Sequence, residues 1–178
     1  MKDKLTLDVF YPHPPERVWK ALTDPKALGQ WLMPTNFQPM LGARFRFDGL
    51  KRGGAQSVEG FVIELEVAKR LTYSWDDGED DAPGIVSWTL SPVDGGTKLR
   101  LEHTPAEASQ PYVLIEANLN WKYAMYASLP VMLRLLEAEA RKPRAPIVYV
   151  QDEPETEPNS ESAPKRRAGF RQEEATCC

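Results

Sequence analysis

Few of the residue types that carry out chemistry are present, and their spacing does not match a metal-binding or catalytic motif. The 178-residue chain has two histidines, His13 and His103, and two cysteines, Cys177 and Cys178. A zinc site needs three or four convergent ligands, and no serine lies in a G-x-S-x-G turn. We therefore expect no metal, no cofactor and no catalytic residue.

Other charged or glycine-rich segments are interpreted as surface features. The acidic run 76–81 lacks the ligand spacing and closing Glu of a calcium loop. Segment 49–54 lacks the GxxxxGK[ST] phosphate-binding pattern. Glu64 and Glu66 are predicted on the solvated face of their strand. The two terminal cysteines follow the basic run 165–167 and resemble a paired prenylation end, but free thiols are the simpler interpretation.

His103 is the polar residue of greatest interest. It alternates on the same side of its segment as Leu99 and Leu101, which places it toward the interior. A polar group there either completes a hydrogen-bond network in the core or contacts a bound molecule. The sequence leaves both roles open.

The main element that must position these residues is a long predicted helix, in which apolar residues recur at helical spacing from residue 112 to about 140. Trp121 and Met125 lie on its wide apolar face, at steps of three, four or seven residues. Pro130 predicts a kink near Tyr126. A helix of this length needs a sheet to cover such a face.

The preceding sequence supplies that sheet. Alternating apolar residues predict a first strand over 5–11 and about five more antiparallel strands, over 44–48, 61–67, 71–75, 85–90 and 97–103. Two short helices follow the first strand, one starting at Pro14 or Pro15 and one at Pro25 with Asp24 as its N-cap. Gly60 is interpreted as a bulge. The predicted fold class is α+β.

Composition sets the domain boundaries and the expected location. We predict one domain over residues 1–141, a short extension over 142–150, and a disordered tail rich in Pro and Glu over 151–178. A net charge of −4 does not favour nucleic-acid binding. No apolar run has membrane-spanning length and no signal peptide is evident, so a cytoplasmic protein without an integral membrane segment is expected.

Several segments occur in an order and spacing typical of a known family: Pro14–Pro25, Leu28–Trp31, Gly42–Phe45, Gly60–Glu64, Arg70–Trp75 and Gly96–His103. Together they resemble the START-like (SRPBCC, helix-grip) superfamily, and within it the activators of heat shock protein 90 ATPase. The resemblance covers roughly residues 3–140. It implies a curved antiparallel sheet of about six strands wrapped around a long C-terminal helix. Asn120-Trp121 keeps the Trp of a Gly-Trp pair common in the family and lacks the Gly.

The resemblance also implies a cavity between the sheet and that helix. We expect it to bind a hydrophobic small molecule or lipid without catalysis, at Trp31, Phe45, Trp75, Trp88, His103, Trp121 and Met125. One alternative is a protein-interaction module with a chaperone partner. The eukaryotic chaperone activators carry a further N-terminal domain, whereas this sequence starts at the START-like segment, which favours the small molecule. The other alternative is an enzyme similar to polyketide cyclases, with His103 as its acid–base residue.

Overall fold

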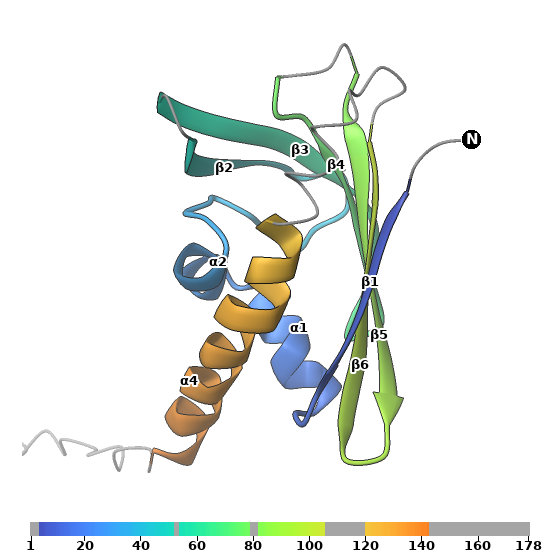
Figure 1. Cartoon of the computed structure of the whole chain (residues 1–178), viewed down its shortest axis with the longest axis vertical. Coiled ribbons are helices and arrows are strands. Elements are labelled where there is room, and N and C mark those ends of the chain that lie inside the picture. Colours follow the sequence, from blue (N-terminus) through green and yellow to red (C-terminus); the bar gives the residue numbers. More distant parts are fainter. Residues whose placement is uncertain (1–3, 52–53, 79–81, 106–119, 143–178) are drawn as a thin grey trace, which may run out of the picture. The chain divides into compact units, whose positions relative to one another are not determined.

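The computed structural model describes residues 4–51, 54–78, 82–105 and 120–142. The strands are β1 (Leu5–Tyr11), β2 (Arg44–Lys51), β3 (Gly54–Glu66), β4 (Arg70–Trp75), β5 (Gly84–Val93) and β6 (Gly96–Thr104). The helical elements are α1 (Pro15–Thr23), α2 (Pro25–Trp31), the π-helical turn η1 (Ala124–Ser128) and α4 (Leu129–Arg141). Figure 1 shows the helices on one side of the sheet, with β2 and β3 curving over them. None of the described helices is long and apolar enough to cross a membrane.

The strands form one antiparallel sheet in the order β1-β6-β5-β4-β3-β2. Strands β2 to β6 are a meander, in which each strand pairs with the next along the chain. The first strand pairs with the last, and Leu5 lies opposite His103. The predicted α+β fold class, with six antiparallel strands and two short helices after the first, is confirmed.

Proline and aspartate fix the starts of the two short helices. Pro15 is the first residue of α1, and Pro25 is the first residue of α2. The Asp24 carboxylate accepts hydrogen bonds from the amides of Lys26 at 2.8 Å and Ala27 at 3.0 Å. These bonds satisfy N–H groups that have no partner within the helix. The predicted N-cap is therefore confirmed.

The C-terminal helix is irregular just before Pro130, close to the kink that the sequence predicts near Tyr126. Residues 120–123 are helical, η1 follows, and α4 continues to Arg141. The Leu129 amide donates to the carbonyl of Ala124, five residues back, which is the π-helical pattern. Pro130 follows directly and has no N–H to continue the ladder. The part of the predicted helix before residue 120 lies outside the described residues.

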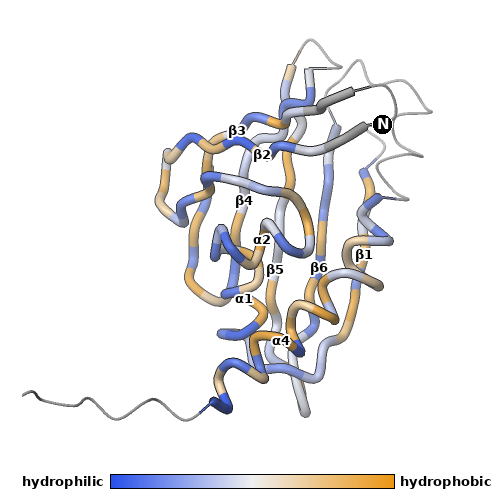
Figure 2. Tube along the Cα trace, turned by 90° about the vertical axis from the view of Figure 1, so that its left-hand side faces the viewer, coloured by the Kyte–Doolittle hydropathy of each residue, from blue (hydrophilic) through white to orange (hydrophobic). Residues whose placement is uncertain are grey.

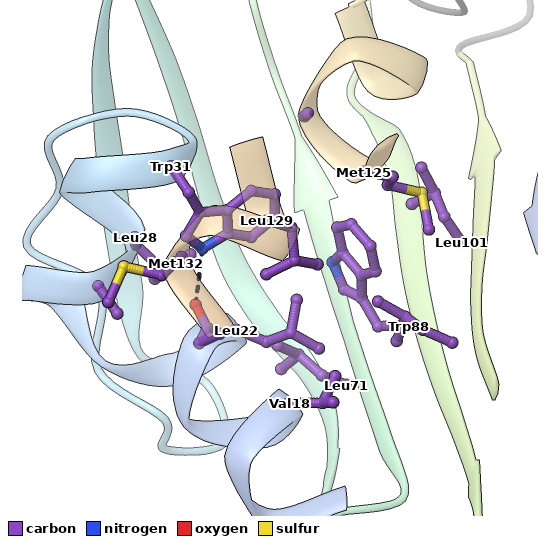
Figure 3. Close-up of a cluster of buried hydrophobic side chains, with 14 of the residues drawn as sticks. Val18, Leu22, Leu28, Trp31, Leu71, Trp88, Leu101, Met125, Leu129 and Met132 are labelled. Carbon is purple, nitrogen blue, oxygen red and sulfur yellow. Dashed lines mark hydrogen bonds between the residues drawn. The ribbon is translucent and has the colours of Figure 1, made fainter. Parts of the chain in front are cut away.

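The core lies between the inner face of the sheet and the helices. Figure 2 shows hydrophobic residues interspersed with hydrophilic ones along the strands, as expected for a sheet with one covered face. Figure 3 shows the side chains that meet in this layer, drawn from α1, α2, the sheet and the C-terminal helix. Trp88, Met125 and Leu129 are among those that are almost completely buried.

Strand β3 departs from the predicted pattern. Phe61 and Ile63 are 44% and 40% exposed, whereas Val62 is buried. The bulge interpreted at Gly60 is not where the strand pairing breaks. The register instead shifts between Val62 and Glu64, so Val62 lies opposite Tyr73 and Leu65 lies opposite Leu71. One extra residue exchanges the two faces of a strand, which turns Phe61 outward.

Gly60 has another role in that strand. It lies opposite Phe45 in the β2–β3 register. A Cβ at this position would lie 2.6 Å from Cζ of Phe45 and even closer to the carbonyl oxygen of Ser74. The glycine therefore allows the Phe45 ring and the neighbouring strand to approach the β3 backbone.

Candidate functional site

The structure places all seven predicted site residues in or against the core on the inner side of the sheet, although the ring contacts of Phe45 are with Phe37, Phe47 and Tyr73 rather than with the other six. Six of the seven are buried and Trp75 is half-buried. Trp31 comes from α2, and four strands supply one residue each: Phe45 from β2, Trp75 from β4, Trp88 from β5 and His103 from β6. The C-terminal helix supplies Trp121, just before η1, and Met125, within η1. Alternation placed the strand residues on the inner face, and the structure agrees.

Four tryptophans form a continuous row of ring contacts. The ring centroids of Trp31 and Trp88 are 6.3 Å apart, those of Trp88 and Trp121 are 5.5 Å apart, and those of Trp121 and Trp75 are 5.2 Å apart. The first two pairs meet edge to face, at interplanar angles of 78°. Such pairs are more stable than their buried area alone predicts.

Phe45 joins this row through aromatic rings that the predicted site did not include. Its centroid lies 5.1 Å from Phe37, 5.3 Å from Phe47 and 5.2 Å from Tyr73. Phe47 in turn lies 5.8 Å from Trp75. The alternation of β2 and β4 could have identified Phe47 and Tyr73. Phe37 lies between α2 and β2, outside any periodic pattern, so no local signal identified it.

The indole N–H groups of the three buried tryptophans are satisfied inside the protein. Trp31 donates to the carbonyl of Ala21 at 2.8 Å, and Trp88 donates to the hydroxyl of Tyr73 at 2.9 Å. Trp121 donates to Nδ1 of His103 at 3.2 Å. Burial raises the pKa of Tyr73 well above its usual range, so its hydroxyl stays protonated. These indoles therefore present apolar ring surface to their surroundings.

His103 is a neutral hydrogen-bonding residue in this site. It is buried, and burial lowers the pKa of its imidazole to about 4. Its Nδ1 accepts the Trp121 hydrogen bond, so that nitrogen's lone pair is already engaged. The hydrogen-bond role predicted for His103 is present, and its use as a base at Nδ1 would require breaking this bond.

The other residues with potential chemistry do not gather around the cluster. In the part of the chain that the structure describes, no group of three or more His, Cys, Asp or Glu could hold a metal ion. His13 lies where β1 leads into α1, with its Nδ1 3.0 Å from Nη1 of Arg17 and 4.0 Å from a Glu137 oxygen. Glu64 and Glu66 are exposed, as predicted, and pair with basic residues of the same hairpin. Cys177, Cys178 and residues 52–53 and 79–81 lie outside the described residues.

A shallow groove borders the C-terminal helix beside α2. Its volume is about 290 Å³, and it is lined by Gln30, Tyr123, Ala127, Ser128, Val131, Met132 and Leu135. Tyr123, Val131 and Leu135 are 71%, 54% and 48% exposed. Sequence analysis did not anticipate this groove, because periodicity placed Met132 on the apolar face and assigned Tyr123, Val131 and Leu135 to neither face.

The sequence matches the family described as "Activator of Hsp90 ATPase homolog 1-like protein" over residues 12–134. The chain belongs to this family. The matched range includes all seven predicted site residues, and residues 142–178 lie beyond it. The resemblance to the activator branch of the START-like (SRPBCC, helix-grip) superfamily is thus confirmed. No curated protein matches the sequence significantly.

Solved structures share the fold of this Activator of Hsp90 ATPase homolog 1-like chain. Protein MLL2253 from Mesorhizobium loti is 29% identical over 75% of this chain and 98% of its own, with a TM-score of 0.66. CalU16 from Micromonospora echinospora is 26% identical over 77% and 84%, with a TM-score of 0.57. The Aha1 dimer from Colwellia psychrerythraea is 16% identical over 70% and 92%, with a TM-score of 0.58, and at that identity shows the fold alone.

Proposed function

We propose that this protein binds an apolar small molecule or lipid, without catalysis, at the aromatic cluster between the sheet and the C-terminal helix. The observation that carries the proposal is the tryptophan row, whose three buried indole N–H groups already have partners within the protein. Apolar walls with few polar groups are typical of small-molecule sites. The expected cytoplasmic location stays a prediction.

Entry of a molecule requires some of the rings to part, because the described rings are in contact. Trp75 is the half-buried member of the row, and it contacts both Phe47 and Trp121. Met125 is fully buried in η1, where the helix has a π-helical turn. Methionine adapts its shape readily, and π-helical turns occur frequently at functional sites. These two side chains are therefore the ones that we expect to move.

A neutral fluorescent probe tests the proposal. N-phenyl-1-naphthylamine should bind saturably and raise the melting temperature. At a concentration about 100-fold above its dissociation constant it would stabilise the fold by roughly 2.7 kcal/mol. Trp75→Leu and Met125→Leu should change probe affinity, whereas Phe61→Ala, on the opposite face of the sheet, should not. Absence of saturable binding, or equal affinity in all three variants, would refute the proposal.

A second candidate function is binding of a protein partner, and the exposed apolar residues of the groove favour it. Tyr123, Val131 and Leu135 expose apolar surface on one side of the C-terminal helix. The family description names heat shock protein 90, so purified heat shock protein 90 is the partner to test. Titration with the wild type should show saturable binding that Val131→Asp weakens and Phe61→Asp does not. Equal behaviour of the two variants would exclude the groove.

A further inference from the structure

The C-terminal helix presents an apolar stripe to solvent, in addition to the face that it buries. Tyr123, Ala127, Val131 and Leu135 follow one another at steps of four residues and line the groove beside α2 together. Tyr123, Val131 and Leu135 are 71%, 54% and 48% exposed. These four residues are called the exposed stripe below. Contiguous apolar surface of this kind marks an interaction site for a protein or a membrane.

Basic residues border the exposed stripe. Segment 120–142 contains four basic and two acidic residues, although the whole chain has a net charge of −4. All four basic residues are exposed: Lys122, Arg134, Arg141 and Lys142. On the α2 side of the groove, Lys26 is exposed one helical turn before Gln30, which lines the groove. Positive charge therefore reaches the exposed stripe from two elements.

Negative charge beside the exposed stripe is limited. Of the two acidic residues on segment 120–142, Glu137 pairs with Arg141 at 2.7 Å, so its charge is already balanced. Glu139 is exposed. Three of the bordering basic residues have no ion-pair partner among the described residues: Lys26, Lys122 and Arg134. Their charges are thus available to an anion outside the protein.

We infer that the exposed stripe and its basic border bind the surface of an anionic lipid bilayer. The apolar side chains then enter the headgroup region, and the basic side chains contact lipid phosphates. Tyr123 suits this boundary, because a tyrosine has an apolar ring and a polar hydroxyl. A second copy of the chain fits less well, since a two-fold contact would place two positively charged borders against each other. This surface is separate from the aromatic cluster, so the inference does not depend on the proposed apolar ligand.

Vesicles of two compositions test the inference. One kind contains equal parts of phosphatidylcholine and phosphatidylglycerol, and the other contains phosphatidylcholine alone. The full-length protein should co-sediment with the anionic vesicles at about 0.1 M salt and should stay in solution with the others. About 1 M salt shortens the Debye length from about 10 Å to about 3 Å and should release most of the protein. Binding to neither kind of vesicle, or equal binding to both, would overturn the inference.

Two variants alter the two parts of the surface. Val131→Asp places a charge in the exposed stripe and should remove most of the binding. Arg134→Gln removes one cation and should weaken binding about fivefold. The matched controls are Phe61→Asp and Lys98→Gln, which change exposed residues on the opposite face of the sheet and should bind as the wild type does. Unchanged binding in Val131→Asp would overturn the inference.

NMR of the unaltered protein locates the contact. Lipids that carry a nitroxide near the headgroup should broaden the amide signals of Tyr123, Val131 and Leu135 more than those of Phe61 and Lys98. Broadening confined to the opposite face would overturn the inference. If heat shock protein 90 binds through Val131 and the anionic vesicles do not bind, the groove belongs to that partner and this inference fails. The apolar-probe titration reports on the aromatic cluster, so its failure would count against the proposed function alone.

Discussion

The hydroxyl of Tyr11 donates a 2.6 Å hydrogen bond to the main-chain carbonyl of Met125, 114 residues further along the chain. In a regular α-helix that carbonyl would accept from the Leu129 amide, but Leu129 donates to Ala124 instead. In a π-helical pattern it would accept from residue 130, which is proline and has no N–H. Tyr11, at the end of β1, thus supplies a donor to the irregular turn of the helix.

Tyr11→Phe should destabilise the protein by about 1–3 kcal/mol, because it leaves a buried carbonyl without its side-chain donor. Burial raises the pKa of Tyr11 well above its usual range, so the donor is present at any ordinary pH. Urea unfolding measures the effect. Tyr126→Phe is the control, since the Tyr126 hydroxyl is exposed and lies 3.4 Å from its acceptor. A change below about 0.5 kcal/mol for Tyr11→Phe would contradict this account.

Trp121→Ala should be severely destabilising. The side chain is 4% exposed and contacts Trp75, Trp88 and His103. Loss of a packed indole costs about 3–5 kcal/mol, and His103 would also lose its donor. Calorimetry of this variant beside Tyr123→Ala, whose side chain is 71% exposed, provides the comparison. Near-native stability of Trp121→Ala would mean that the indole does not contribute to the core.

Stability should fall as the pH drops from about 6.5 to 4. The pKa of His103 is about 4 in the folded protein and 6.5 when exposed, so over this range the unfolded chain binds the proton and the native state does not. Proton uptake by the unfolded state favours unfolding, and the loss approaches about 3 kcal/mol near pH 4. Well above pH 6.5 neither state binds the proton, and this residue contributes no pH dependence.

Urea unfolding at pH 7 and pH 5 measures that slope. His103→Gln should lose less stability than the wild type between the two values. The pKa of His13 is also lowered, mainly by burial and then by Arg17, so His13→Gln should remove a separate part of the slope. Identical slopes in the wild type and His103→Gln would show that folding does not lower the pKa of His103.

Gly60→Ala should cost about 1–3 kcal/mol or more, because its Cβ would overlap the Phe45 ring and the backbone of Ser74. Gly29→Ala is the matched substitution. Gly29 lies in α2, where a Cβ would meet its nearest neighbour, Cα of Pro34, at 3.6 Å. That change should stabilise the protein by about 0.5–1 kcal/mol. Thermal unfolding of both variants tests the pair, and equal effects would refute the role assigned to Gly60.

Deletion of residues 155–178 should leave the domain intact. Their composition, with Phe170 as the only large apolar group before the two cysteines, offers little surface to bury. The melting temperature should shift by less than about 4 °C, the change expected for roughly 1 kcal/mol in a domain of this size. A larger drop, measured against the full-length chain, would place part of the stabilising structure in the deleted segment.

Local sequence rules determined most of the architecture. Alternation defined the strands and assigned Trp88, Leu101 and His103 to the inner face, since a side chain's face follows directly from a period of two. Asp24 and Pro25 marked a helix start because capping is a property of neighbouring residues. Pro130 located the irregularity in the helix, because its missing N–H acts over only one turn.

The tertiary structure decided what depends on residues that are distant in the chain. The bulge after Val62 turned Phe61 outward, because register is set by pairing with β4 rather than by β3 alone. Nδ1 of His103 accepts its hydrogen bond from Trp121, 18 residues further along the chain, and the carbonyl of Met125 accepts from Tyr11, 114 residues earlier. A hydrogen bond requires both partners to be in place, so only the folded chain could reveal these pairs.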